Sequence, residues 1–135
     1  MRDLSRKIVF FVPFFFWALF VSHQGLAILN WPSFNADAFT SAQDEGRPIV
    51  VVVHAEWCAT CRSQEPSLNK VVSLPEYKDF VLFRIDFDTQ KDVMAELNIP
   101  VRSTIIIYRG SREAGRLVAE TSFDVIRDLF SFGLS

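Results

Sequence analysis

The apolar and polar positions of residues 28–135 follow two patterns, one typical of helices and one typical of strands. The run of residues 49–53 is apolar throughout, as expected of a central strand that is buried on both faces. Proline, glycine and small polar residues separate the apolar segments and predict turns between them. In chain order, the predicted elements are a helix from Ser33 or Asn35 to about Gln43, a strand over 49–53, a helix after Cys58 that contains Pro66, a strand over 80–88, a helix over 90–97, strands over 104–108 and 115–119, and a last helix that Thr121 or Ser122 begins.

The order of these elements predicts an α/β fold in which helices flank one mixed β-sheet. A helix joins the first two strands, which are therefore expected to be parallel. A turn over residues 109–112 joins the last two strands and predicts an antiparallel hairpin. The chain of 135 residues has room for one such domain, residues 28–135, and a short appendage. The last helix carries an apolar stripe for packing on the sheet, formed by Phe123, Ile126, Leu129 and Phe130.

The first 27 residues differ from the rest and are predicted to be a signal peptide or an N-terminal membrane anchor. A net-positive start over residues 1–7 precedes fourteen uncharged residues, 8–21. This length fits the apolar region of a secretory signal and is shorter than the roughly 20 residues of a membrane-spanning helix. Residues 25–27 supply the small side chains of a cleavage site, whereas an uncleaved anchor would extend over 8–29. A buried core helix is disfavoured by the basic start and by the many phenylalanines.

Charge and composition limit the classes of partner. The net charge is −2, and no run of lysine and arginine stands out, which argues against nucleic-acid binding. A signal peptide and an anchor would both place the domain outside the cytoplasm. We expect a monomer that carries no cofactor.

Cys58 and Cys61 are the only cysteines, and they stand at the junction between the strand over 49–53 and the next helix. A Cys-x-x-Cys pair in this position is typical of a redox-active dithiol. An inert structural bridge is disfavoured, because so short a loop stabilises a fold little through chain entropy. Two thiolates also suit Cu(I) or Zn(II), so a metallochaperone module is the alternative. The sequence near the pair offers no further cysteine, methionine or pair of histidines to complete a tetrahedral site.

The sequence Ala-Glu-Trp-Cys-Ala-Thr-Cys at residues 55–61 resembles the thioredoxin superfamily. The similarity extends over about residues 35–132 and includes Pro66, the strand that ends in Asp88, and the strand over 104–108. With its leader, the chain resembles the exported bacterial thioredoxin-like proteins in particular. The resemblance implies a thioredoxin-like fold, a periplasmic location, either secreted or anchored to the inner membrane, and disulfide exchange with protein substrates. It also implies a membrane electron-transfer partner if the protein acts as a reductase.

The resemblance also assigns roles at the site. Cys58 is expected to be the exposed nucleophile, because the amides and the dipole of a helix N-terminus favour a thiolate. Cys61 is expected to be more buried and to resolve the mixed disulfide. Trp57 is expected to shield the pair and to pack beside the substrate. The other supporting residues implied by the resemblance are Ala59, Thr60, Ser103 and Thr104.

Three features depart from the family's pattern, and one of them is the dipeptide Ala59-Thr60, where the family has Gly-Pro. Ser103 stands where the family has a proline, usually after a cis peptide bond, in a loop that pairs with substrate and keeps metal from the dithiol. Because a cis peptide bond before a residue other than proline costs about 3–4 kcal/mol, we expect the bond between Arg102 and Ser103 to be trans. Val52 replaces a buried aspartate, and Arg84 replaces the lysine beside it. Proton transfer to Cys61 would therefore use water or another group.

Two further polar features each allow two interpretations. His54 is either a base or electrostatic partner of the dithiol, or a packed and hydrogen-bonded histidine at a strand end. Alternation along the strand places it on the same face as Val52. The acidic residues Asp86, Asp88 and Asp92 form either a calcium site or a solvated strand end. Their spacing is not that of an EF-hand loop, which favours the solvated strand end.

Overall fold

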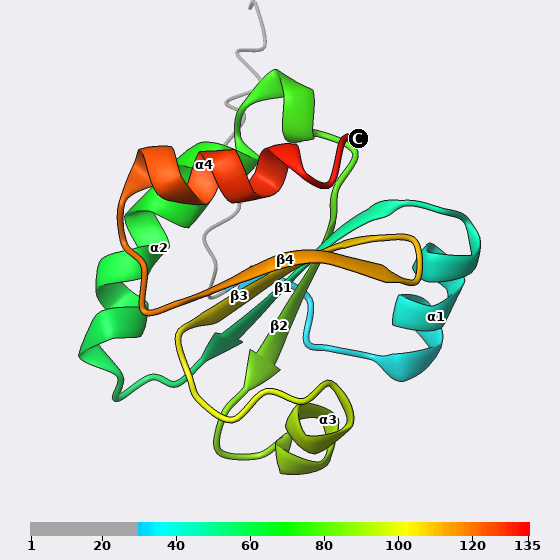
Figure 1. Ribbon diagram of the computed structural model, residues 1–135. Coiled ribbons are helices and arrows are strands. Elements are labelled where there is room, and N and C mark those ends of the chain that lie inside the picture. Colours follow the sequence, from blue (N-terminus) through cyan, green and yellow to red (C-terminus); the bar gives the residue numbers. More distant parts are fainter. Residues whose placement is uncertain (1–29) are drawn as a thin grey trace, which may run out of the picture.

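The computed structural model describes residues 30–135, which form a four-stranded sheet with helices on both faces (Figure 1). The predicted signal peptide or anchor lies outside these residues. No helix within residues 30–135 has the length and apolar character that crossing a membrane requires. In chain order, the elements are α1 (Ala36–Asp44), β1 (Pro48–His54), α2 (Ala59–Val72), the 3-10 helix η2 (Pro75–Tyr77), β2 (Val81–Asp86), α3 (Lys91–Glu96), β3 (Thr104–Arg109), β4 (Arg112–Val118) and α4 (Phe123–Ser131).

The strand order in the sheet is β2-β1-β3-β4, with β1 near the centre. The pairs form as predicted: β1 and β2 are parallel, and β3 and β4 form an antiparallel hairpin. β1 also pairs with β3 in antiparallel orientation, so the sheet is mixed. Along the free edge of β2, the backbone N–H of Phe34 donates to the carbonyl of Arg84 at 2.8 Å. The segment before α1 thus covers part of the outer edge of the sheet.

The core has two halves, one on each face of the sheet. Val50 and Val52 of β1 face α2 and α4, where they pack with buried side chains of both helices. Val51 and its neighbours Ile49 and Val53 face α1 and α3. Full burial of one such side chain contributes about 1.5–3 kcal/mol, which explains why an unbroken apolar strand lies in the middle of the fold. This confirms the prediction that β1 is buried on both faces.

Several element ends show which residues set them. Asn35 begins α1, since its Oδ1 accepts the N–H of Ala38 at 2.9 Å. β2 ends at Asp86, two residues earlier than predicted, because the Asp86 carboxylate accepts the N–H groups of Asp88 and Thr89 and turns the chain. Ser122 occupies the cap position of α4, but its side chain makes no capping bond. Short polar side chains therefore fix some of these boundaries.

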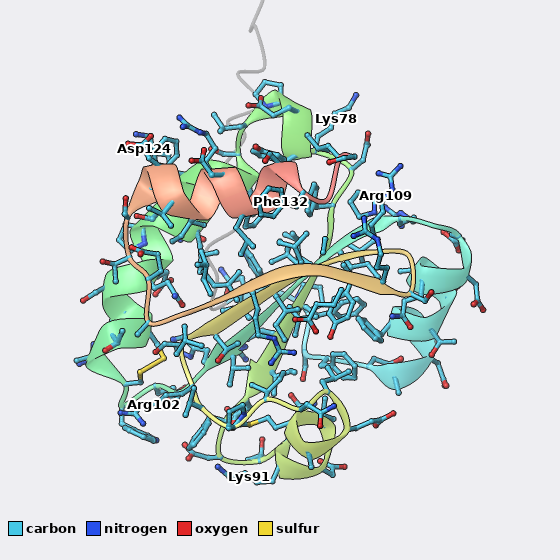
Figure 2. The ribbon with its side chains drawn as sticks, in the orientation of Figure 1. Lys78, Lys91, Arg102, Arg109, Asp124 and Phe132 are labelled. Atoms are coloured by element: carbon cyan, nitrogen blue, oxygen red, sulfur yellow. A yellow bond between two sulfur atoms is a disulfide. The ribbon has the colours of Figure 1, made fainter. Side chains whose placement is uncertain are left out.

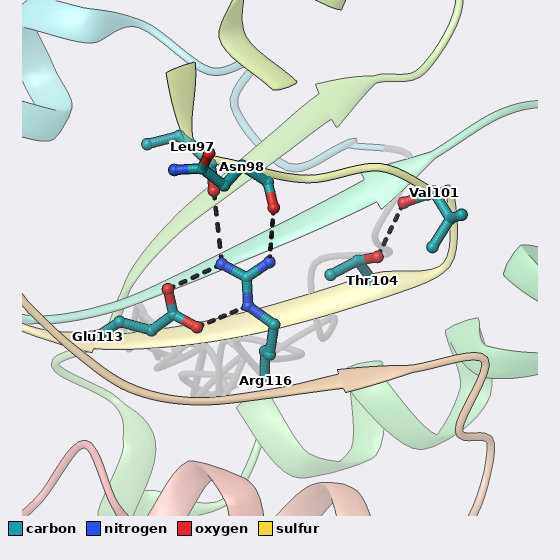
Figure 3. A network of polar contacts seen from close by, with 6 residues as sticks. All are labelled: Leu97, Asn98, Val101, Thr104, Glu113 and Arg116. Atoms are coloured by element: carbon teal, nitrogen blue, oxygen red, sulfur yellow. Dashed lines mark hydrogen bonds and ion pairs between the residues drawn. The ribbon is translucent and has the colours of Figure 1, made fainter. Parts of the chain in front are cut away.

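The hairpin of β3 and β4 is joined to the loop after α3. β4 begins three residues earlier than predicted, at Arg112. Arg116 makes two hydrogen bonds to the Glu113 carboxylate and donates to the carbonyls of Leu97 and Asn98 (Figure 3). This pairing lowers the pKa of Glu113. The contacts connect β4 to the chain segment that leads toward Ser103.

Candidate active site

The two cysteines lie at the point where β1 gives way to α2. Cys58 occupies the N-cap position of α2, and its backbone N–H donates to the carbonyl of Ala55 at 3.1 Å. Its Sγ accepts the N–H of Cys61 at 3.2 Å. The two residues are joined by a disulfide, seen at the start of α2 near Arg102 in Figure 2. The amide of Cys61 in the first turn of the helix thus points toward the Sγ of Cys58, as it must to stabilise a thiolate.

The prediction that Cys58 is exposed and Cys61 more buried is wrong for this disulfide-bonded state. Each residue is only 2% exposed. Phe87 packs against the cluster of both cysteines and Ala55. The loop of Ser103, which is distant in sequence, also contacts the sulfurs. Their different positions in the helix, rather than exposure, therefore distinguish the two cysteines.

Ser103 is buried and contacts both sulfurs. Its Oγ lies 3.3 Å from the Sγ of Cys58 and 3.1 Å from the Sγ of Cys61. Its backbone has φ = +58°, and residues 30–135 contain no cis peptide bond, so the expected trans bond before Ser103 is present. The N–H of Ser103 donates to the carbonyl of Val53 at 3.0 Å. A proline in this position would have no N–H to make that bond.

Trp57 forms an exposed surface next to the pair. The residue is 55% exposed, and its ring makes a T-shaped contact with Phe87, with 6.1 Å between ring centroids. The indole Nε1 donates to Oδ2 of Asp88 at 2.7 Å, and the guanidinium of Arg102 lies 4.8 Å from the ring centroid. These three contacts therefore hold the indole in place while much of its surface stays open to solvent.

The other predicted supporting residues have different positions. Ala59 and Thr60 form the first turn of α2, and Ala59 is exposed. Thr104 is fully buried, and its hydroxyl donates to the carbonyl of Val101 at 2.8 Å (Figure 3). It therefore fixes the loop that carries Ser103, and no hydrogen bond joins its hydroxyl to either sulfur.

His54 lies on the face of the sheet that α2 covers. It is 3% exposed and lines a cavity of about 240 Å³ together with Glu56, Arg62 and Glu65. Burial lowers the pKa of His54, and the nearby charge of Arg84 lowers it further. Within the described part of the chain, its Nε2 has no hydrogen-bond partner. The interpretation as a packed histidine is thus confirmed for burial but wrong for hydrogen bonding at Nε2.

Val52, at the position where the resemblance predicts a buried aspartate, is an apolar residue paired with the charged Arg84. Val52 is 1% exposed and lies directly opposite Arg84 in β2. The Nε of Arg84 is buried and has no hydrogen-bond partner among residues 30–135. No carboxylate thus occupies this point of β1.

The acidic residues at the end of β2 have separate structural tasks. Asp86 accepts hydrogen bonds from Thr89 and from the Asp88 backbone, which lower its pKa although burial opposes them. Asp88 holds the Trp57 indole. Within residues 30–135, no group of three or more histidine, cysteine, aspartate or glutamate residues is arranged to hold a metal ion.

Gln64 is a site residue that the sequence analysis did not identify. It is 1% exposed, and its Nε2 donates to the carbonyl of Ser103 at 3.2 Å and to that of Glu120 at 2.8 Å. The signal in the sequence is an amide at helical spacing from Cys61 and Leu68, which are both buried. A polar residue on the apolar face of a helix needs a partner, and here the partner is the loop that carries Ser103.

A disulfide at the start of a helix that follows a central strand defines a class of proteins that exchange thiols and disulfides. The sequence profile of the Thioredoxin family matches residues 31–131. Thioredoxin-2 of Saccharomyces cerevisiae is 31% identical over 85 residues, which cover 62% of this chain and 80% of the yeast protein. Thioredoxin H-type of Fagopyrum esculentum is 25% identical over 93 residues, which cover 69% of this chain and 78% of the plant protein.

The crystal structure of Trxlp from Edwardsiella tarda EIB202 has a TM-score of 0.71 and is 35% identical, covering 73% of this chain and 96% of that chain. The chain therefore belongs to the thioredoxin family. It has the thioredoxin fold, as the sequence predicts, and it is a thiol–disulfide oxidoreductase with the pair Cys58 and Cys61 beside Trp57. The relatives are thioredoxins in general and do not single out the exported bacterial proteins.

Proposed function

We propose that this protein is an exported thiol–disulfide oxidoreductase in which Cys58 is the nucleophile and Cys61 the resolving cysteine. The observation that carries the assignment of roles is the position of Cys58 at the N-cap of α2, where its Sγ accepts the N–H of Cys61 at 3.2 Å. The same hydrogen bond and the helix dipole stabilise a negative charge on Cys58 when the pair is reduced. Cys61 lies within the first turn and has no comparable amide.

The proposed reaction consists of two exchanges. The Cys58 thiolate attacks one sulfur of a substrate disulfide, which forms a mixed disulfide and releases the first substrate thiol. Cys61 then attacks the Sγ of Cys58, which closes the Cys58–Cys61 disulfide and releases the second substrate thiol. The protein loses two electrons and two protons, and the substrate gains both. The reverse sequence oxidises a substrate dithiol, and the redox partner decides the direction.

The surface around the pair supports a protein as substrate. Trp57 and Val101 are 55% and 39% exposed, and Arg102 stacks on the Trp57 ring. This combination of apolar area and one cation suits an extended polypeptide better than a small thiol, because apolar contact and backbone pairing both add affinity. Disulfide exchange with protein substrates is also what thioredoxins do in general.

The proposal of export rests on the leader. A basic start and the fourteen uncharged residues 8–21 support a secretory signal, and an extension to residue 29 supports an anchor. Outside the cytoplasm the pair has no access to the cytosolic pool of reductants. A reductase there needs electrons from a membrane partner, whereas an oxidase needs an oxidising partner.

Trapping in cells tests both parts of the proposal. In the full-length chain, Cys61→Ser leaves Cys58 able to form mixed disulfides but removes the group that resolves them. We expect adducts with other proteins, sensitive to reductant, in the periplasmic or inner-membrane fraction. The control is the double variant Cys58→Ser, Cys61→Ser, which cannot form them. The absence of adducts would overturn exchange with proteins, and adducts confined to the cytoplasm would overturn export.

A further inference from the structure

We propose that Ser103 is a catalytic residue whose hydroxyl links the ionisation of Cys58 to the protonation of Cys61. This inference rests on the proposed function and deepens it. Ser103 touches both reacting atoms, with Oγ 3.3 Å from the Sγ of Cys58 and 3.1 Å from the Sγ of Cys61. Among the described residues, it is the one side chain that hydrogen-bonds the sulfurs. The other polar neighbours are the N–H of Cys61, which donates to the Sγ of Cys58, and the carbonyl of Val53, which lies 3.9 Å from the Sγ of Cys61 and accepts its S–H only when the pair is reduced.

The backbone of Ser103 is held so that its hydroxyl cannot easily leave the sulfurs. Its N–H donates to the carbonyl of Val53, and its own carbonyl accepts from Ala119 at 3.0 Å and from Gln64 at 3.2 Å. The residue is 2% exposed and has φ = +58°. A residue other than glycine with positive φ is uncommon and persists only where its surroundings fix it. Contacts from β1, α2 and the end of β4 thus fix the position of the hydroxyl.

A hydroxyl suits this position because it donates one hydrogen bond and accepts others. In the reduced protein, Ser103 donates to the Cys58 thiolate and accepts the S–H of Cys61. This arrangement keeps the negative charge on the nucleophile and the proton on Cys61. Once Cys58 enters a mixed disulfide it carries no charge, and the same hydroxyl turns its hydrogen to Cys61 as that thiol ionises and attacks.

The hydroxyl neither gains nor loses an atom in the cycle. The dithiol is oxidised by two electrons and the substrate disulfide is reduced by two. One substrate thiol takes the proton of Cys61, and the other takes a proton from solvent, which replaces the one that Cys58 lost when it ionised. Ser103 lowers the free energy of each thiolate in turn. It thereby supplies a polar contact at a site where Val52 provides no carboxylate.

The other groups around the sulfurs do not replace this contact. Ala55 and Phe87 are apolar. Glu56 and Arg62, which flank the pair in the chain, and Arg102, which precedes Ser103, are exposed. His54 and Glu65 line the cavity under α2, and the sulfurs have no hydrogen bond to either. Opposite β1, Arg84 and Asp86 of β2 lie beside Val52 and His54.

The test compares full-length variants that lack or keep the hydroxyl. Ser103→Ala removes it, and Ser103→Gly removes it while accepting the positive φ, so at least one variant without a hydroxyl keeps the fold. Ser73→Ala removes a hydroxyl at the far end of α2, where it donates to the carbonyl of Lys70, and serves as the control. The readout is the rate of alkylation of Cys58 in the reduced protein as a function of pH, with the modified cysteine identified by mass spectrometry.

We expect the Ala and Gly variants to raise the pKa of the Cys58 thiol by about one and to slow alkylation about tenfold at pH values below the wild-type pKa, the effect of losing one hydrogen bond to a charged sulfur. The Ser73→Ala variant should stay near the wild type. Folded Gly or Ala variants with the wild-type pKa would overturn the role of Ser103. If the wild-type pair does not cycle between dithiol and disulfide at all, the proposed function fails instead.

Discussion

Gln64→Leu tests whether the buried amide of Gln64 fastens α2 to the loop that carries Ser103. The substitution keeps the side-chain size but removes two hydrogen bonds, those to the carbonyls of Ser103 and Glu120. Each such bond contributes about 1 kcal/mol, and a buried carbonyl left without a donor costs about 1–3 kcal/mol. The Ser103 carbonyl keeps the N–H of Ala119, so the larger penalty falls on Glu120 alone. Leucine offsets part of the free energy lost with these hydrogen bonds, because it buries more apolar surface. The expected net loss of stability is about 2 kcal/mol.

Urea denaturation measures this loss. With a denaturant dependence of roughly 2 kcal/mol per molar urea, the midpoint should fall by about 1 M without a change in slope. Ser67→Ala is the matched control, since it removes a single hydrogen bond from the same helix to the carbonyl of Thr121, 2.7 Å long and more accessible to water. The control should lose about 0.5–1 kcal/mol. A Gln64→Leu variant no less stable than Ser67→Ala would show that Gln64 does not fasten α2 to the loop of Ser103.

Two other predictions concern groups close to the pair. Because burial lowers the pKa of His54 in the folded protein, the unfolded chain binds more protons below about pH 6.5, and stability should fall from pH 7.5 to 5.5. His54→Leu should abolish most of this fall in urea midpoints measured at the two pH values, and an equal fall in the variant would show that other groups cause it. Asp88→Ala removes the acceptor of the Trp57 indole N–H. It should slow disulfide exchange with protein substrates several-fold while lowering stability by only about 1 kcal/mol, and unchanged exchange kinetics would mean that the anchored indole does not position substrate.

Most of the fold follows from local patterns in the sequence. The apolar run of β1 predicts a strand buried on both faces, and the turn at Gly110 predicts an antiparallel hairpin. The structure confirms both. The stripe of α4 is buried as predicted, with Phe123 at its edge. Boundaries were less predictable. β2 ends where the Asp86 carboxylate accepts N–H groups of the residues that follow, and β4 begins at Arg112, which pairs with Arg109 across a tight turn.

The site depends more on distant contacts. The two cysteines and the indole could be predicted because they are neighbours in the sequence at a helix start. The burial of Cys58 could not, since the hydroxyl that covers it comes from Ser103, 45 residues away. The role of Gln64 was hidden for the same reason: its acceptors lie in two loops that only the folded sheet brings together.

A redox titration shows whether Cys58 and Cys61 form a reversible redox pair. The full-length protein is equilibrated with glutathione buffers of graded potential, and the free thiols are counted by alkylation. We expect a reversible two-electron transition of Cys58 and Cys61 at a midpoint between about −120 and −270 mV, the range of known dithiol enzymes. A pair that never oxidises reversibly, and that instead binds one equivalent of Cu(I), would show that the protein is not a disulfide-exchanging enzyme.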